Sequence, residues 1–197
     1  MMTIGYSPGR LREALLNAGI DLLEEGRARP GLREIARRAG VTPTATYRHF
    51  ASQDELLAAI AAAGSADLAT EFGKIPPSAS PKRLLAMAEA YFGFANRRPA
   101  MFRLMFGNTV SLRDANGALR PDPAWDMYLD AVASSVGRRR DELIVLEQAV
   151  RLWACVHGYV LLSMDERVAE ITLDRDLLLR VLDPLVATDG RRAPSGE

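Results

Sequence analysis

The stretch GVTPTATYRHF, residues 40–50, gathers side chains that could bind another molecule. Threonine, tyrosine, histidine and arginine all donate hydrogen bonds, and an arginine guanidinium can bond at two points to a guanine edge or a phosphate group. If a helix begins near residue 43, four side chains face outward together: Thr42, Thr44, Ala45 and Arg48. A polar, exposed helix start of this kind fits a DNA major groove, so the stretch is a candidate DNA-reading surface.

The residues around this stretch predict a helix-turn-helix. A short helix is expected over residues 32–39, and it ends at Gly40 because glycine tolerates the positive φ of a helix end. Thr42 is a good N-cap and Pro43 suits the first position of a second helix, which is expected to end near residue 49. Two short helices joined by a short turn have the spacing of this DNA-binding motif.

A longer helix is predicted on each side of the motif. Residues 8–25 repeat leucine and alanine at intervals of three and four, which places one apolar stripe on the first of these helices. Ser52 can cap the helix that follows the motif, and Glu55 can reach back in a capping box. Phe50 is expected to pack against both long helices and to anchor the motif on them.

Helical periodicity continues through the rest of the chain, and the sequence shows no convincing alternating strand pattern. The proline- and serine-rich residues 73–81 predict a loop. Further helices are expected at residues 81–97, from Pro99 onward, around residues 125–137, at residues 141–164 and across residues 178–186. The sequence therefore predicts an all-α protein of about nine helices.

Composition narrows the class of protein. With 197 residues, 48% of them hydrophobic, the chain is long enough for one domain or two small ones with a sizeable core. No uncharged apolar run reaches the about 18 to 20 residues of a membrane span, and the start of the chain shows no export signal. A cytoplasmic protein without a membrane partner is expected. One cysteine and two distant histidines predict neither an internal disulfide nor a metal site, and no cofactor is expected.

Charge is distributed unevenly although its sum is zero. Residues 1–50 hold eight basic and five acidic side chains, a net charge of +3, so the remainder of the chain is net −3. An excess this small is usual for solvated helix faces. It marks the N-terminal quarter only as the place to look for nucleic-acid contacts.

Residues 32–57, LREIARRAGVTPTATYRHFASQDELL, resemble the TetR/AcrR family of bacterial one-component regulators. The similarity comprises a short helix, a glycine turn, a threonine cap, a Tyr-x-His-Phe sequence and the start of a fourth helix. It implies a helix-turn-helix DNA-binding domain at residues 1–56, a helical effector-binding and dimerisation domain at residues 57–188, and a disordered tail at residues 189–197. Residues 152–162, LWACVHGYVLL, are similar to the Trp-x-x-x-His-Gly (WHG) signature of one C-terminal subclass.

The resemblance implies roles for the residues of the motif. Residues 42–45 face bases or the groove floor, Tyr47 and His49 contact phosphate, and Arg48 contacts a guanine or a phosphate. For Tyr47 and His49, packing within the protein is the alternative. The candidate DNA-contacting residues are Arg33, Thr42, Pro43, Thr44, Ala45, Tyr47, Arg48, His49 and Gln53.

The chain departs from the family pattern at two positions. Gln53, a neutral donor, stands where a basic residue commonly meets phosphate at the start of helix four. Gly31 must cap helix two, where the family often has a threonine. Both departures concern the strength of DNA binding and leave the geometry of the motif intact.

The C-terminal helices predict a dimer. The helix at residues 141–164 is apolar on more than half of its circumference and therefore needs packing partners on two sides. The last helix is similar, so we expect the two to pack against the same pair of a second subunit in a symmetric four-helix interface. The expected interface residues are Leu146, Val150, Gly158, Leu161, Leu178, Val181, Leu182 and Leu185.

The family also implies an effector pocket in the C-terminal domain. Its expected lining residues are Phe92, Met101, Phe102, Met105, Phe106, Trp125, Tyr128, Trp153 and His157. For each of these side chains, a place in the hydrophobic core is the alternative. Because these helix faces are almost free of charge, the expected effector is a small, mostly apolar molecule with one polar group near Tyr128 or His157.

These expectations describe a dimeric DNA-binding regulator, in the first place a repressor that its effector releases from a palindromic operator. One alternative is an enzyme or chaperone-like binder that uses the C-terminal cavity, but no Ser-His-Asp arrangement or phosphate-binding glycine loop supports it. Another alternative is redox control through the thiol of Cys155. A cysteine on a buried helix face is usually an inert apolar residue.

Overall fold

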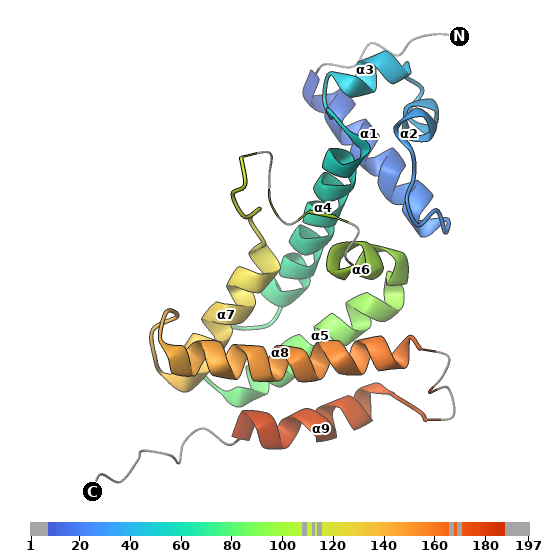
Figure 1. Ribbon diagram of the computed structural model, residues 1–197. Coiled ribbons are helices and arrows are strands. Elements are labelled where there is room, and N and C mark those ends of the chain that lie inside the picture. The colour runs from blue at the N-terminus through green and yellow to red at the C-terminus, as the bar shows by residue number, and fades with distance from the viewer. Residues whose placement is uncertain are drawn as a thin grey trace, which may run out of the picture. The chain divides into compact units, whose positions relative to one another are not determined.

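The computed structural model describes residues 8–107, 110–111, 113, 116–165, 168 and 171–187. Helices dominate these residues, whose one strand-like pairing is a β-bridge between Arg113 and Leu119. The all-α prediction is confirmed for this part of the chain (Figure 1). In chain order the helices are α1 (Pro8–Glu24), α2 (Leu32–Arg38), α3 (Pro43–Tyr47), α4 (Gln53–Gly73), α5 (Pro81–Arg97), α6 (Pro99–Phe106), α7 (Pro123–Val136), α8 (Leu143–Ser163) and α9 (Arg175–Ala187).

The described helices group into two compact units. The first unit holds the residues up to Ala66 together with Arg97–Asp122, and the second holds Asp67–Asn96 together with the residues from Pro123 onward. This division differs from the predicted domain boundary after residue 56, because α6 packs against α1 and groups with the N-terminal helices. The predicted tail at residues 189–197 lies outside the described residues.

Apolar side chains at helical spacing form the core of the first unit. Leu15 of α1, Ile35 of α2 and the predicted anchor Phe50 are at most 1% exposed. Gly19 lets α4 approach α1 closely, because a Cβ atom at this position would lie 2.6 Å from Cδ1 of Ile60. The motif that precedes α4 is therefore held on a tightly packed helix pair.

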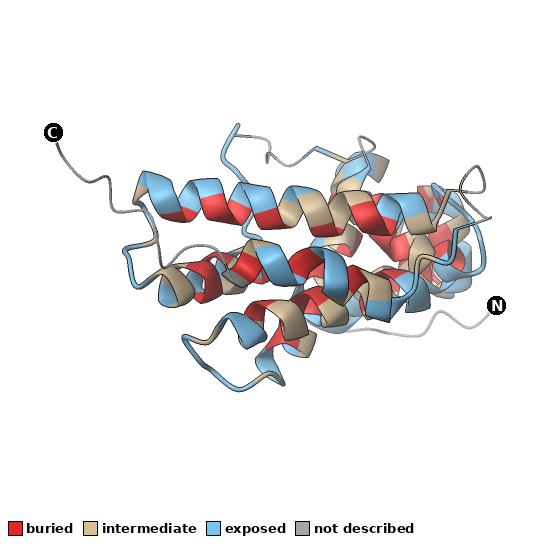
Figure 2. Cartoon of the chain, turned by 90° about the horizontal axis from the view of Figure 1, so that it is seen from below, coloured by how far each residue is buried: buried red, intermediate tan, exposed pale blue. Residues whose placement is uncertain are grey.

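Helices α5, α7, α8 and α9 form most of the second unit. Helix α8 packs against both α7 and α9, and the buried positions recur on one side of each helix (Figure 2). Two side-chain hydrogen bonds join α8 to the α9 region: Gln148 Nε2 donates to the Leu185 carbonyl at 2.9 Å, and Tyr159 Oη donates to the Asp174 carbonyl at 2.7 Å. Each bond satisfies a polar group at an otherwise apolar contact.

Among the described helices, α4 alone is long and apolar enough, by length and composition, to cross a membrane. Its large side chains are instead buried within the protein: Leu56, Leu57, Ile60, Leu68 and Phe72 are at most 4% exposed. Alanine supplies much of the remaining apolar character. Helix α4 is therefore a core helix of this fold.

Candidate nucleic-acid interface and C-terminal sites

The turn between α2 and α3 has the geometry that the helix-turn-helix requires. Gly40 has a φ of +70°, a left-handed conformation that other L-residues rarely adopt. The Val41 amide donates to the Ala36 carbonyl at 2.9 Å, which closes the end of α2. Thr42 then caps α3 by accepting a backbone amide hydrogen bond at 3.4 Å, and Pro43 occupies the first turn.

Helix α3 presents polar side chains on its outer side. Thr42, Thr44 and Arg48 are exposed, as is Pro43, while Ala45 is half-buried. Four of the five residues that the sequence assigns to the groove are therefore exposed, and Ala45 is partly covered. Their hydroxyl and guanidinium groups are accessible donors for base edges or phosphates.

The end of α3 separates inward-facing from outward-facing side chains. Thr46 is 0% exposed and Phe50 is 1% exposed, whereas Tyr47 is 55% exposed. His49 is half-buried. The Tyr47 ring is therefore a surface group rather than a core group. The helix is shorter than predicted because the amides of His49 and Phe50 both donate to the Thr46 carbonyl, at 3.0 Å each, as the chain turns away.

The start of α4 carries a variant of the predicted capping box. Ser52 Oγ accepts from the Glu55 amide at 3.1 Å, as the prediction requires. The Glu55 carboxylate, however, accepts from the amide of Ala51 at 2.7 Å rather than from that of Ser52. The first turn of α4 is thereby fixed to the chain that leaves α3.

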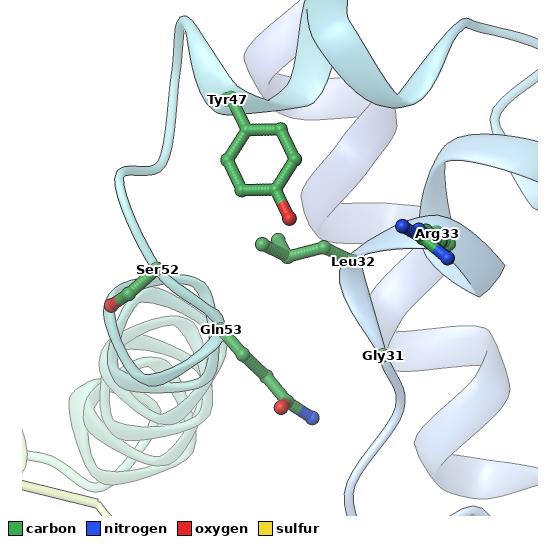
Figure 3. Close-up of a pocket in the computed structure, with 6 residues that line it drawn as sticks. All are labelled: Gly31, Leu32, Arg33, Tyr47, Ser52 and Gln53. Carbon is green, nitrogen blue, oxygen red and sulfur yellow. The ribbon is translucent and has the colours of Figure 1, made fainter.

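A solvent-open pocket of about 370 Å³ lies where the starts of α2 and α4 face the end of α3 (Figure 3). Its lining residues are Gly31, Leu32, Arg33, Tyr47, Ser52 and Gln53, and we call it the helix-start cavity. Figure 3 shows the Tyr47 hydroxyl pointing toward Leu32, while Gln53 reaches from α4 toward the segment before α2. Three predicted DNA contacts, Arg33, Tyr47 and Gln53, therefore share one cavity.

Gln53 uses its amide inside the protein. Its Nε2 donates to the carbonyl oxygens of Pro30 at 3.1 Å and of Arg29 at 3.3 Å. Because both partners are acceptors, the NH₂ group and not the amide oxygen must face them. The residue predicted to offer a neutral donor to phosphate thus has its donor group engaged with the α1–α2 loop.

Ion pairs neutralise part of the positive charge of the first unit. Arg38 makes two hydrogen bonds to the Glu25 carboxylate, at 2.8 and 2.6 Å, and this contact lowers the pKa of Glu25. Arg33 and Arg48 are exposed and form no ion pair with any described residue. These two guanidinium groups therefore contribute unneutralised positive charge to the surface around α3.

The predicted effector-pocket residues fall into two groups. Met101, Phe102, Met105 and Phe106 belong to α6, in the first unit. Met101 and Phe102 are 0% exposed, which agrees with the core alternative for these two side chains. The remaining five lie in the second unit and are half-buried: Phe92, Trp125, Tyr128, Trp153 and His157.

Four of these side chains form an aromatic row in the second unit. Ring centroids are 5.6 Å apart for Tyr128 and Trp125, 5.8 Å for Trp125 and Trp153, and 5.0 Å for the stacked rings of Trp153 and His157. His157 Nδ1 lies 2.8 Å from the Tyr91 hydroxyl. Burial lowers the pKa of His157, which keeps the imidazole neutral at pH 7. The row can offer ring faces and few charges to a planar apolar molecule.

Tyr128 makes its polar contact within the protein. Its hydroxyl donates to the Ala149 carbonyl at 2.7 Å, which joins α7 to α8. Burial raises the pKa of Tyr128, so the phenol is neutral at all physiological pH values. Both polar groups predicted near an effector, Tyr128 and His157, therefore have hydrogen-bond partners within the chain.

The outer side of α8 exposes large apolar side chains beside the charged Glu147 and Arg151. Leu146 is 40% exposed, Val150 59% and Leu161 49%, and Val181 on α9 is 41% exposed. No atom lies within 4 Å of a Cβ placed on Gly158. These five predicted interface residues leave apolar surface or open space on the subunit.

Two predicted interface residues are buried within the subunit. Leu178 is 0% exposed and Leu182 is 2% exposed, so both side chains are already buried in the core of their own chain. Leu185 is half-buried. Conversely, Leu143 and Leu162 are 70% and 49% exposed and were not predicted. We call Leu143, Leu146, Val150, Leu161 and Leu162 the α8 stripe.

Cys155 is half-buried on α8. Burial raises the pKa of its thiol, which lowers the thiolate fraction at neutral pH. Low thiolate content disfavours the oxidation that a redox switch would need. Within the described residues, no three His, Cys, Asp or Glu side chains are grouped as metal ligands.

Two family descriptions match this chain. The one named "Bacterial regulatory proteins, tetR family" matches residues 15–60, and "Tetracyclin repressor-like, C-terminal domain" matches residues 84–185. The HTH-type transcriptional regulator Rv1816 of Mycobacterium tuberculosis (strain ATCC 25618 / H37Rv) is 35% identical over 94 residues. That match covers 45% of this chain and only 40% of the Rv1816 protein.

Solved structures share the fold over most of the chain. A protein of unknown function from Rhodococcus sp. RHA1 is similar at a TM-score of 0.68 and 24% identity, covering 89% of this chain and 93% of its own. The multidrug binding protein EbrR, solved with imidazole, is similar at a TM-score of 0.64 and 21% identity, covering 96% and 94%. With the helix-turn-helix geometry and both family matches in agreement, this chain belongs to the TetR family of DNA-binding transcriptional regulators.

Proposed function

We propose that the protein is a dimeric repressor that leaves a palindromic operator when a small, mostly apolar effector binds. The observation that carries this proposal is the exposed polar side of α3, where Thr42, Thr44 and Arg48 surround a helix start held by the Gly40 turn. A helix start presented in this way suits a DNA major groove. The transcription-regulator family also disfavours an enzymatic role.

In the proposed complex, residues 42–45 lie against base edges and Arg48 bonds to a guanine or a phosphate. Tyr47 and His49 contact the sugar-phosphate backbone. The exposure of Tyr47 and Arg48 supports these roles. Sequence preference would come mainly from Arg48 and the two threonines, and affinity from the phosphate contacts.

The α8 stripe, with Gly158 and Val181, supports a dimer. Exposed large apolar side chains along one helix suit a self-complementary interface, and Gly158 would allow the partner helix to come close. Two recognition helices related by twofold symmetry would meet successive major grooves about 34 to 36 Å apart. Such a spacing reads an inverted repeat.

The aromatic row supports an apolar effector. The EbrR protein to which this fold is similar is described as a multidrug binding protein, and ring faces such as those of Trp125 and Trp153 suit planar apolar molecules. The neutral His157 would supply the polar contact. Effector binding needs a coupling of only about 1 to 3 kcal/mol to change DNA occupancy about 5- to 150-fold.

The subclass of the C-terminal domain and the cellular location of the protein are also part of this proposal. The Trp153, His157 and Gly158 spacing supports membership of the WHG subclass. A regulator that acts on DNA would work in the cytoplasm without a membrane partner, and the proposed mechanism requires no metal or cofactor.

The test of DNA recognition is selection of random duplex DNA by the purified protein, repeated with Arg48→Ala and Tyr47→Phe at two salt concentrations. We expect a palindrome to be enriched by the wild type and lost with Arg48→Ala. Binding should weaken as salt rises, because phosphate contacts release counterions. A well-folded dimer that enriches no sequence would contradict the proposal.

The effector is tested by titrating a panel of apolar compounds while tryptophan fluorescence is recorded. Saturable quenching of Trp125 or Trp153, together with release of the selected operator, is the expected result. Compounds that quench the fluorescence without changing operator binding would separate the aromatic row from regulation.

A further inference from the structure

Gln53 connects two elements that main-chain hydrogen bonds do not join. It is the first residue of α4, and its side-chain amide reaches back 23 and 24 positions to the carbonyl groups of Pro30 and Arg29. Those carbonyls lie in the loop directly before α2. The bond to Pro30 is part-buried, which shields it from competing water.

The start of α2 has no side-chain cap of its own. Its N-cap is Gly31, which provides no side-chain hydrogen bond to the first turn. Arg29 also forms an ion pair with Asp54, the second residue of α4. Both partners of this pair are largely exposed, with 46% and 65% of their side chains accessible. The pair therefore adds little to the stability of this contact. The Gln53 amide therefore supplies a part-buried polar link between the α1–α2 loop and α4, beside the exposed Arg29–Asp54 pair.

This link spans the helix-start cavity. Arg33 lies on the α2 side of the cavity, Gln53 on the α4 side, and the Tyr47 hydroxyl points into the space between α3 and Leu32. The position of the α2 start relative to α4 thus sets the separation of the cavity walls. A change in that separation would move Arg33 relative to Tyr47.

We propose that Gln53 is a positioning residue for recognition of the DNA backbone: its amide fixes the α1–α2 loop on α4 so that Arg33 and Tyr47 flank one phosphate group. It acts through these two residues and makes no phosphate contact through its NH₂ group. This inference rests on the proposed DNA-binding function. It assigns to Gln53 a role different from that of the basic residue that commonly occupies this position.

The two roles predict different results in the absence of DNA. A positioning residue stabilises the α2 start in the free protein, whereas a direct phosphate donor affects only the complex. Gln53→Met keeps a side chain of similar length and removes the donor. Hydrogen exchange of the Ile35 and Ala36 amides in the free protein should therefore become faster in Gln53→Met if the residue positions α2.

The roles also differ in a double-mutant cycle on the selected operator. We expect Gln53→Met to weaken binding by about 3- to 10-fold, the range for loss of one neutral hydrogen bond. Tyr47→Phe should then cost less in the Gln53→Met background than in the wild type, because the hydroxyl is no longer held in place. Arg48→Ala serves as the matched control, and its effect should add to that of Gln53→Met.

Gln53→Lys provides a second variant in case Gln53→Met folds poorly. Its ammonium group can donate to the Pro30 carbonyl or to a phosphate, but not in the same geometry to both. We expect slow exchange at Ile35 to be kept and the salt dependence of binding to remain that of the wild type. A direct phosphate contact would instead steepen the log–log slope by about 0.9.

The inference is overturned if Gln53→Met leaves amide exchange unchanged in the free protein, or if its effect on binding simply adds to that of Tyr47→Phe. A Gln53→Lys variant with a steeper salt slope and fast exchange at Ile35 also contradicts it. If the wild type enriches no DNA sequence, the proposed function fails. The exchange experiment still decides whether Gln53 fixes the α2 start.

Discussion

Arg98 donates a hydrogen bond from Nε to Oε1 of Glu24 at 2.9 Å, across 74 positions of sequence. Glu24 is the last residue of α1, and Arg98 is the residue directly before α6. The side chains are 25% and 32% exposed, so water screens the pair only in part. This contact is one reason why α6 groups with the DNA-binding helices.

Glu24→Gln should weaken this contact without changing the size of the side chain. We expect the free energy of unfolding to fall by about 0.5 to 1 kcal/mol, at the upper end of the range for surface ion pairs. Urea unfolding at low and high salt measures this loss, which should shrink as salt rises. Asp141→Asn, which weakens the fully exposed pair with Arg139, is the control and should leave stability unchanged. An equal loss in both variants would argue against a specific role for the Glu24 contact.

Gly64 is expected to resist substitution although it lies within a helix. A Cβ at this position would lie 2.7 Å from the sulfur atoms of both Met101 and Met105. Alanine favours helix by about 1 kcal/mol, but overpacking costs about 1 to 3 kcal/mol, so Gly64→Ala should be destabilising overall. Thermal unfolding measures the change. Gly9→Ala is the matched control, since no atom lies within 4 Å of that site, and it should be neutral or stabilising.

Val150→Glu should disrupt the proposed dimer. Val150 is 59% exposed on the α8 stripe, so glutamate is tolerated by the subunit but would bury charge in the interface. Analytical ultracentrifugation should show a shift to monomer. Ile171→Glu changes a β-branched residue of 56% exposure outside α8 and α9, and it should leave the association state unchanged. A wild type that sediments only as monomer would refute this interface.

The raised pKa of the Tyr128 phenol should lower the free energy of unfolding at alkaline pH. Burial raises its pKa in the folded protein, so as pH rises past about 10 the unfolded chain loses the phenol proton first and gains stability relative to the folded chain. The free energy of unfolding should therefore decrease above that pH. Tyr128→Phe should reduce this slope. It should also cost about 1 kcal/mol at neutral pH, because the Ala149 carbonyl loses its side-chain donor.

Much of the first unit could be predicted because its signals are local. Gly40, Thr42, Pro43 and Ser52 each act within one turn of helix. The structure gives Gly40 a positive φ, makes Thr42 and Ser52 caps and places Pro43 in the first turn of α3. Helical spacing likewise located the buried side of α1. Such features depend on the residue and its immediate neighbours, which a single sequence contains.

The side-chain partners could not be predicted because they depend on distant backbone. The engagement of Gln53 with the Pro30 carbonyl requires knowledge of where the α1–α2 loop lies. The same holds for α9, where periodicity identifies Leu178 and Leu182 as apolar but does not say whether the chain itself or a partner covers them. Leu143, at the start of α8, was not predicted as an interface residue, although it lies seven positions before Val150 and therefore shares its side of the helix.

If the α8 stripe forms the proposed dimer interface, it also determines how the protein responds to its own concentration. If two chains must cover each other's stripe before they reach an operator, dimer formation depends on the square of the chain concentration while chains are scarce. Halving the amount of protein would then lower operator occupancy by up to about fourfold rather than twofold. In a cell that contains little of the protein, repression of the regulated genes would then be lost steeply, even in the absence of any effector.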